Sequence, residues 1–274
     1  MNTIQNGYLR STHKLIKRKL LLPTLRSLLI FLLCSSSIYG IAQLGDERKI
    51  PSYFGIYAKM VLPNSAIGNS PVTISKNGFT STITPAIGYS FGATVRAGIT
   101  KLIAFETGIN FTQRNSSIQM ELQDSAISGS NTLGFIQYDI PLNALIYIQL
   151  SKQWYANASI GLAVGFKPTN VGIVNYPGGL HTFTHTGYVK NKIGLDINGN
   201  FGIEYRTKKS GIFNVGGSVR IPLQPLFEFI AVYSNQSYRT GGVADISGSY
   251  LTVDLKYFLP LKRGNSTVKK GPIE

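Results

Sequence analysis

Apolar and polar residues alternate along eight stretches of this chain, and no charged residue occurs in their apolar rows. In the clearest stretch, Ile87 to Ile99, apolar side chains at odd positions alternate with Gly, Ser, Thr and Arg. Successive side chains of a strand point to opposite faces, so each stretch has one apolar face and one small or polar face. The pattern predicts eight strands, over residues 52–63, 85–99, 102–114, 133–149, 154–167, 192–206, 212–223 and 249–259.

The connections between these strands alternate in length. Short links contain Thr100-Lys101, Leu150 to Gln153 and Thr207 to Gly211, whereas long links cover 64–84, 115–132, 168–191 and 224–248. The apolar positions of two strands joined by a short link agree in parity, as facing residues of a hairpin must. The sequence therefore predicts an all-β fold, an eight-stranded antiparallel up-and-down transmembrane β-barrel with short periplasmic turns and long extracellular loops.

Composition supports a lipid-facing exterior. Charged residues make up 14% of the chain, well below the roughly 25% typical of soluble domains. Aromatic residues gather towards the predicted strand ends, as the girdles of membrane barrels do; they are Trp154, Tyr205, Phe213 and Tyr257 near the short links, with Phe111, Phe135 and Phe166 near the long ones. The net charge of +15 includes six bases before residue 43. Without a basic helix or a nucleic-acid motif, we expect no nucleic-acid partner.

The first 42 residues read as a secretory signal peptide. A basic region precedes the apolar run Leu28 to Leu33, and the small-residue site Gly40-Ile41-Ala42 stands before Gln43. That run is shorter than the roughly 20 residues of a spanning helix. We expect a periplasmic segment over 43–51, the barrel over 52–259 and a basic periplasmic tail over 260–274. The only cysteine, Cys34, belongs to the signal peptide, so the mature protein has no disulfide.

Charges of both signs occur on the polar faces of the predicted strands. In a hairpin centred near Lys101, Arg96 and Glu106 lie opposite one another. Ions inside a narrow barrel are costly unless they are paired, and an eight-stranded barrel is filled by its own side chains. We therefore predict a structural cluster of paired charges in the lumen, formed by Lys59, Arg96, Glu106, Asp139, Lys167, Asp196, Glu204, Arg220, Asp254 and Lys256.

One short motif carries a family resemblance. At Asp139-Ile140-Pro141-Leu142 the chain resembles the small outer-membrane β-barrel (PorT-like) family of Bacteroidetes, whose members often show an acid-Ile-Pro-Leu element in a middle strand. The resemblance spans about residues 50–259 and includes the Ala42-Gln43 cleavage style and the final Tyr257-Phe258. The chain departs from it at Asn143 to Ile146, where members often read Leu-Leu-Lys-Tyr. The resemblance implies a fold and no catalytic residues.

Candidate chemistry is sparse. His181 and His185 have a zinc-like spacing, which suits a helix. Here they follow Pro177-Gly178-Gly179 without a nearby acid or cysteine, so we expect a solvated loop, no metal and no cofactor. No nucleophile motif selects a serine beside them, so we expect no enzyme. The short-turn lysines are expected to meet anionic phospholipid heads; they are Lys101, Lys152, Lys208 and Lys209.

The leading hypothesis is an integral outer-membrane barrel with a side-chain-filled lumen. It would act through surface loops or membrane contacts, in adhesion, envelope integrity or an outer-membrane assembly. A narrow channel, a lipid-modifying enzyme and a soluble lipocalin-like barrel are the alternatives. Expected partners are outer-membrane lipid including lipopolysaccharide, the barrel-assembly machinery during insertion, and a protein at the loops or tail. The apolar stretch Leu226 to Val232 either prolongs the seventh strand or folds over the barrel mouth.

Overall fold

The computed structural model describes residues 52–123, 125, 127–207 and 209–260. The predicted signal peptide, the periplasmic segment and all but the first residue of the tail lie outside these residues. Within them, no helix is long and apolar enough to cross a membrane. The elements of the described chain are β1 (Tyr53–Pro63), the 3-10 helix η1 (Ser65–Ile67), β2 (Val72–Lys76), β3 (Phe79–Gly98), β4 (Ile103–Leu122), β5 (Ser128–Gln149), β6 (Trp154–Phe166), β7 (Val171–Gly178), β8 (His181–Tyr188), β9 (Ile193–Arg206), β10 (Ile212–Pro222), β11 (Phe227–Ser234), β12 (Arg239–Ile246) and β13 (Tyr250–Phe258).

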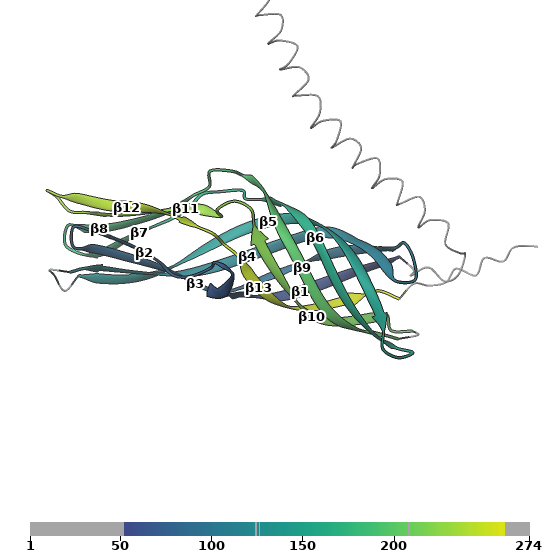
Figure 1. Cartoon of the computed structure of the whole chain (residues 1–274). Coiled ribbons are helices and arrows are strands. Elements are labelled where there is room, and N and C mark those ends of the chain that lie inside the picture. Colours follow the sequence, from purple (N-terminus) through teal and green to yellow (C-terminus); the bar gives the residue numbers. More distant parts are fainter. Residues whose placement is uncertain (1–51, 124, 126, 208, 261–274) are drawn as a thin grey trace, which may run out of the picture. The chain divides into compact units, whose positions relative to one another are not determined.

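A closed ring of antiparallel strands forms one end of the structure (Figure 1). Its strands follow one another in the order β1, β13, β10, β9, β6, β5, β4 and β3, and β3 pairs back with β1. Closure leaves none of these strands with a free edge within the ring, which an open sheet could not achieve.

The short links of the ring are built as the sequence suggests. Thr100 Oγ1 accepts hydrogen bonds from the backbone N–H groups of Leu102 and Ile103, at 3.1 and 2.9 Å. Thr207 Oγ1 accepts one from Ser210 N at 2.9 Å, and Gly211 has a φ of +82°. Hydroxyl side chains and a left-handed glycine stabilise such tight turns. Next to its turn, the β3–β4 pair keeps one register from Tyr89 to Gly98.

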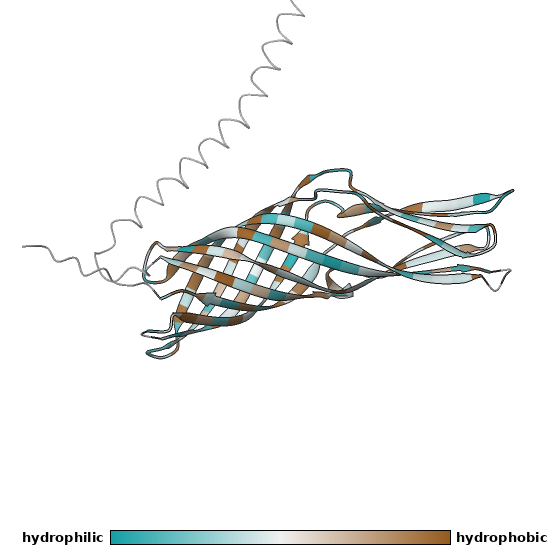
Figure 2. Cartoon of the chain, turned by 180° about the vertical axis from the view of Figure 1, so that it is seen from behind, coloured by the Kyte–Doolittle hydropathy of each residue, from teal (hydrophilic) through white to brown (hydrophobic). Residues whose placement is uncertain are grey.

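Hydrophobic and hydrophilic residues alternate along the strands of the ring (Figure 2). The apolar ones are exposed and the polar ones are buried, which is the reverse of a soluble protein. On β3, Phe91 and Val95 are about half exposed, whereas Thr94 is buried. The same alternation continues around the wall. Exposed apolar residues of the wall include Ile56, Met60, Ile87, Ile109, Ile140, Leu142, Ile146, Ile160, Leu162, Ile193, Phe201, Val215, Val253 and Leu255.

The long connections, which we expected to be loops, are β-structure instead. β3, β4 and β5 continue beyond the ring, and β2 pairs with the extension of β3. β7, β8, β11 and β12 form a second sheet, in the order β12-β11-β8-β7 (Figure 1). The described chain therefore has 13 strands rather than the predicted eight. We call this second region, the two facing sheets beyond the ring, the distal sandwich.

The distal sandwich has its own hydrophobic core. The Phe79 ring in one sheet stacks 5.7 Å from Phe183 and 6.1 Å from Tyr233 in the other. All three side chains are at most 1% exposed. Their burial holds the two sheets together. The other buried members are Ile74, Ile83, Ile118, Met120, Leu133, Phe135, Val189, Leu226, Phe227, Phe229, Ala231 and Ile246.

Two details differ from the predicted pattern. Phe135, expected in an aromatic girdle, is 2% exposed and packs 5.3 Å from Phe227 in the sandwich core. Leu226 to Val232 neither prolongs the preceding strand nor lies as a separate lid, because most of it forms β11 between β8 and β12. Both differences arise because apolar residues beyond the ring pack into the core between the two sheets of the sandwich.

Candidate functional site

Near the short turns, the lumen contains a chain of ion pairs centred on Arg96. Its Nη2 lies 2.7 Å from Glu106 Oε2, and its Nη1 lies 2.7 Å from Glu204 Oε2. Lys256 reaches Glu106 Oε1 at 2.7 Å, and Arg206 reaches Glu204 Oε1 at 2.6 Å. Arg96 and Glu204 are at most 1% exposed. Three cations thus pair with two carboxylates, and these residues come from four strands. Each buried carboxylate has two cationic partners, one at each of its oxygens.

Aromatic rings close the space around these cations. The Arg96 guanidinium lies 3.9 Å from the centre of the Phe258 ring, and Arg206 lies 3.8 Å from that of Tyr155. Tyr147 contacts both cations, at 5.6 and 5.1 Å. Cation–π contact at this range stabilises desolvated guanidinium groups. The combination of paired charge and stacked rings fills this end of the lumen.

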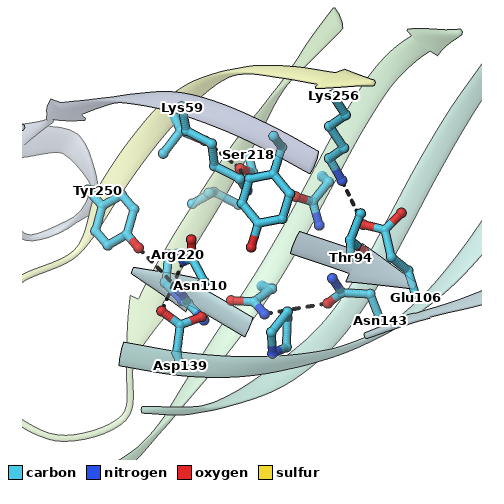
Figure 3. Close-up of a pocket in the computed structure, with 16 residues that line it drawn as sticks. Lys59, Thr94, Glu106, Asn110, Asp139, Asn143, Ser218, Arg220, Tyr250 and Lys256 are labelled. Atoms are coloured by element: carbon cyan, nitrogen blue, oxygen red, sulfur yellow. Dashed lines mark hydrogen bonds and ion pairs between the residues drawn. The ribbon is translucent and has the colours of Figure 1, made fainter. Parts of the chain in front are cut away.

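A second cluster lies further from the short turns and is centred on Arg220, beside Asp139 and Asn110 (Figure 3). Arg220 Nη2 lies 2.8 Å from Asp139 Oδ1, and its Nε lies 3.2 Å from Asp196 Oδ2. Asn110 donates to Asp139 at 3.0 Å and Gln137 donates to Asp196 at 3.1 Å. The neutral amides therefore complete the coordination of both carboxylates.

Between the two clusters, Lys59 pairs with Asp254 at 3.0 Å. Asp254 also accepts hydrogen bonds from Ser218, at 2.9 Å, and from Thr252. The space left beside them, lined by Tyr57 among others, has a volume of about 30 Å³. That is room for one or two water molecules.

The structure places nine of the ten predicted lumen residues in ion pairs, and Arg96 lies directly opposite Glu106 in the strand register. Lys167 is also buried, just beyond the end of β6, but no carboxylate of the described residues lies within 4 Å of it. The sequence pattern does not single out Arg114, because it is the last residue of the predicted strand over 102–114. Arg114 is at an even position, like Asn110 and Thr112, and this places it on the polar face of the strand. That parity could have identified it as a lumen residue.

His181 and His185 do not lie in a solvated loop; that expectation is wrong. Both belong to β8 and point towards the sandwich interior. His185 is fully buried, with Nε2 3.0 Å from Ser81 Oγ and its ring stacked 5.7 Å from Phe229. Burial lowers the pKa of His185 to about 4. Its Nδ1 has no hydrogen-bond partner.

The Ser81–His185 pair is not arranged for catalysis. Both side chains are 0% exposed, and no acid orients the ring. A nucleophile needs access to substrate as well as a base. Across the described residues, no group of three His, Cys, Asp or Glu side chains is placed to hold a metal ion. The pair instead links the two sheets of the sandwich.

The surface of the distal sandwich is rich in hydroxyl and aromatic groups. At the β7–β8 hairpin, Tyr176 is 71% and Leu180 is 61% exposed. On the opposite sheet, a groove of about 390 Å³ is lined by hydroxyl, amide and carboxylate groups and by a backbone glycine. These lining residues are Thr80, Thr82, Gln119, Met120, Glu121, Ser128, Gly129 and Ser130.

No family model and no curated protein matches this chain. Among solved structures, the outer membrane protein OprG from Pseudomonas aeruginosa is 11% identical, with a TM-score of 0.45 over 78% of this chain and 98% of that one. The translocator domain of the autotransporter NalP from Neisseria meningitidis is 8% identical, with a TM-score of 0.23 over 84% of this chain and 95% of that one. The resemblance to the PorT-like family stays a prediction.

Proposed function

We propose that this chain is an integral outer-membrane barrel that displays the distal sandwich as a rigid binding module at the cell surface. The eight strands of the ring would cross the bilayer. Their outer wall is apolar, while the ionised side chains meet one another inside. In water this arrangement would expose a large apolar surface, which soluble monomers rarely do. This observation argues against a lipocalin-like soluble barrel.

Aromatic pairs at both rims of the ring support the membrane placement. Near the short turns, Trp154 lies 4.8 Å from Tyr205 and Phe213 lies 5.1 Å from Tyr257. At the other rim, Phe91 lies 4.8 Å from Phe111. Aromatic girdles of this kind mark the two interfaces of membrane barrels. We place the short turns in the periplasm and the sandwich outside the cell.

The filled lumen is the observation that favours a display protein over a narrow channel. An ion that entered the lumen would have to separate the ion pairs there. Each separated pair would leave a buried charge without its partner, which is costly. The sandwich is then the part able to act on the surroundings. Its Tyr-, Thr-, Ser- and Asn-rich surface suits recognition, which favours adhesion among the roles considered. We further propose that the wall contacts lipopolysaccharide and that insertion uses the barrel-assembly machinery.

Planar-bilayer recording separates display from conduction. We expect folded monomers to show no steady conductance, and Arg96→Ala to stay closed or open only briefly. A steady conductance that changes in Arg96→Ala would instead establish the channel.

Adhesion tests the role of the sandwich directly. Cells that carry the double variant Tyr176→Ser, Leu180→Ser should adhere less to surfaces that the wild type colonises, at an equal outer-membrane level. The matched control is Leu102→Ser, Leu150→Ser at the short links, where both side chains are similarly exposed. Equal adhesion by wild type and the tip variant would contradict recognition through this hairpin.

A further inference from the structure

The interior of the ring and its junction with the sandwich hold more cations than anions. Among the described residues, the inward-pointing carboxylates are all used in the ion pairs given above. Arg114 and Lys167 are left over, both buried and neither within 4 Å of a described carboxylate. A desolvated cation is unfavourable without a counter-charge. The excess positive charge therefore points to an anion from outside the chain.

Arg114 has the geometry of an incomplete anion site. It is 8% exposed, and its Nη1 and Nη2 donate to Gly248 O at 2.6 Å and Gln137 Oε1 at 3.0 Å. The guanidinium lies 4.5 Å from the ring centre of Tyr250. All these partners are neutral, and among the described residues nothing accepts a hydrogen bond from the buried Nε. Only two of the five N–H donors of the guanidinium are used by these hydrogen bonds, so donors are left for a ligand.

A lateral cleft beside the barrel is lined in part by Arg114. β1 pairs with β3 only as far as Gly88, and β2 pairs with β3 only from Phe79 to Ile83. The intervening part of β3 contains Pro85, which has no N–H, and its register against β4 shifts between Ala86 and Tyr89. Between the ring and the part of β3 that pairs with β2, this short segment of β3 therefore has no strand partner on the side of β1 and β2.

The lining of the cleft is mainly apolar, with a polar mouth. Its volume is about 30 Å³, enough for a group the size of one or two water molecules. A carboxylate fits such a volume, whereas a phospholipid headgroup is much larger. The apolar lining is formed by Ile83, Phe135, Leu226, Phe227 and Ile246, and the polar mouth by Asn69, Ser70, Asn115 and Ser116.

We propose that this cleft binds a small carboxylate carried on an apolar chain, as in a fatty acid. The carboxylate would pair with the Arg114 guanidinium, which lines the cleft, and the carbon next to it would contact the apolar lining. Lys167 adds positive charge at the same level of the barrel. It follows Phe166, whose partner on β5 is Tyr138, the neighbour of Gln137. Gln137 in turn accepts from Arg114. This site is separate from the surface of the sandwich that we propose for recognition.

Equilibrium binding of radiolabelled laurate to the protein in lipid nanodiscs tests the site, with empty nanodiscs as the blank. We expect one saturable site that neither dodecanol nor inorganic phosphate occupies at the same concentration. Arg114→Gln should weaken laurate binding at least tenfold, since a charge-assisted hydrogen bond is lost. Arg239→Gln, which removes an exposed arginine of the sandwich, should leave it unchanged.

A second variant keeps the test decisive if Arg114→Gln does not fold. Ser70→Trp would fill the mouth of the cleft without removing the charge, and we expect it to weaken laurate binding as well. Equal binding of dodecanol would overturn the role of Arg114, and equal binding of phosphate would show a site for free anions instead. Unchanged laurate binding in either variant would also overturn the proposal. None of these outcomes bears on conductance or adhesion, so the two proposals fail separately.

Discussion

A single buried side chain in this barrel depends on charges contributed by distant parts of the sequence. Glu204 accepts from Arg96, which is 108 positions away, and from its near neighbour Arg206. Arg96 in turn is held by Glu106 on the adjacent strand. The strand register predicts the Arg96–Glu106 pair, because both residues belong to one hairpin. The Arg96–Glu204 pair could not be predicted, because it forms across the lumen only after the ring closes.

Removal of one member should leave an unmatched buried ion. We expect Glu204→Gln to lower the free energy of unfolding by about 3–5 kcal/mol, the usual cost of breaking a buried pair. Urea unfolding of the protein in lipid vesicles measures the change. Glu228→Gln breaks the more exposed contact with Lys190 and should leave the unfolding curve unchanged. An equal effect of the two substitutions would argue against a desolvated cluster in the lumen.

His185 should make the sandwich sensitive to acid. Its folded pKa, about 4, is below the ordinary value of 6.5, so folding favours the neutral ring. This stabilisation is complete above pH 6.5 and is lost as the pH falls towards 4. Since each pH unit between the two pKa values costs about 1.4 kcal/mol, the total loss is roughly 3 kcal/mol.

Urea unfolding at pH 7 and pH 4.5, followed by near-ultraviolet circular dichroism, measures this loss. His185→Gln should abolish most of the difference between the two pH values. His181→Gln, a partly exposed neighbour on the same strand, should retain it. A pH dependence that survives in His185→Gln would assign the acid sensitivity to other groups.

At the scale of the elements, the strands of the ring can be predicted from the sequence. Their outer side chains face lipid and their inner ones face polar groups, so apolar and polar residues alternate strictly. The predicted strand over 154–167 and the observed β6, Trp154–Phe166, differ by one residue. The four strands of the second sheet have eight residues each, and in β8 three of the eight are Thr, so its alternation is weak. In β8 the inward positions are His181, Phe183, His185 and Gly187, with only one large apolar side chain. Such a segment reads as a polar loop until the second sheet is known.

We expect the distal sandwich to unfold while the barrel stays folded. Phe229→Ala removes a fully buried ring from β11, and we expect a loss of about 3–5 kcal/mol from the cavity left behind. The sandwich should then become sensitive to protease, while the ring keeps the heat-modifiable mobility of a folded barrel in electrophoresis. The control is Val174→Ala, which truncates a side chain that is 47% exposed. Loss of the barrel together with the sandwich would show one cooperative unit instead.

At the scale of the whole molecule, two environments are built into one continuous set of strands. β3 carries exposed Phe91 and Val95 in the ring but buried Phe79 and Ile83 in the sandwich, so the meaning of an apolar residue changes along the strand. The shift in register between Ala86 and Tyr89 lies between these two parts. Periodicity alone cannot show that change, because alternation is present in both. To predict the change, one must know whether lipid or a second sheet lies against the apolar face of β3.

Spin-label accessibility measures the central claim, that lipid surrounds the ring and water surrounds the sandwich. Nitroxides attached at Val95→Cys and Val174→Cys, two sites of similar exposure on the ring and the sandwich, would be compared in lipid vesicles. A lipid-embedded ring predicts that oxygen relaxes the label at 95 strongly, while a water-soluble nickel chelate does not reach it. The label at 174 should give the opposite result. Strong relaxation by the chelate at 95 would contradict the membrane-spanning barrel.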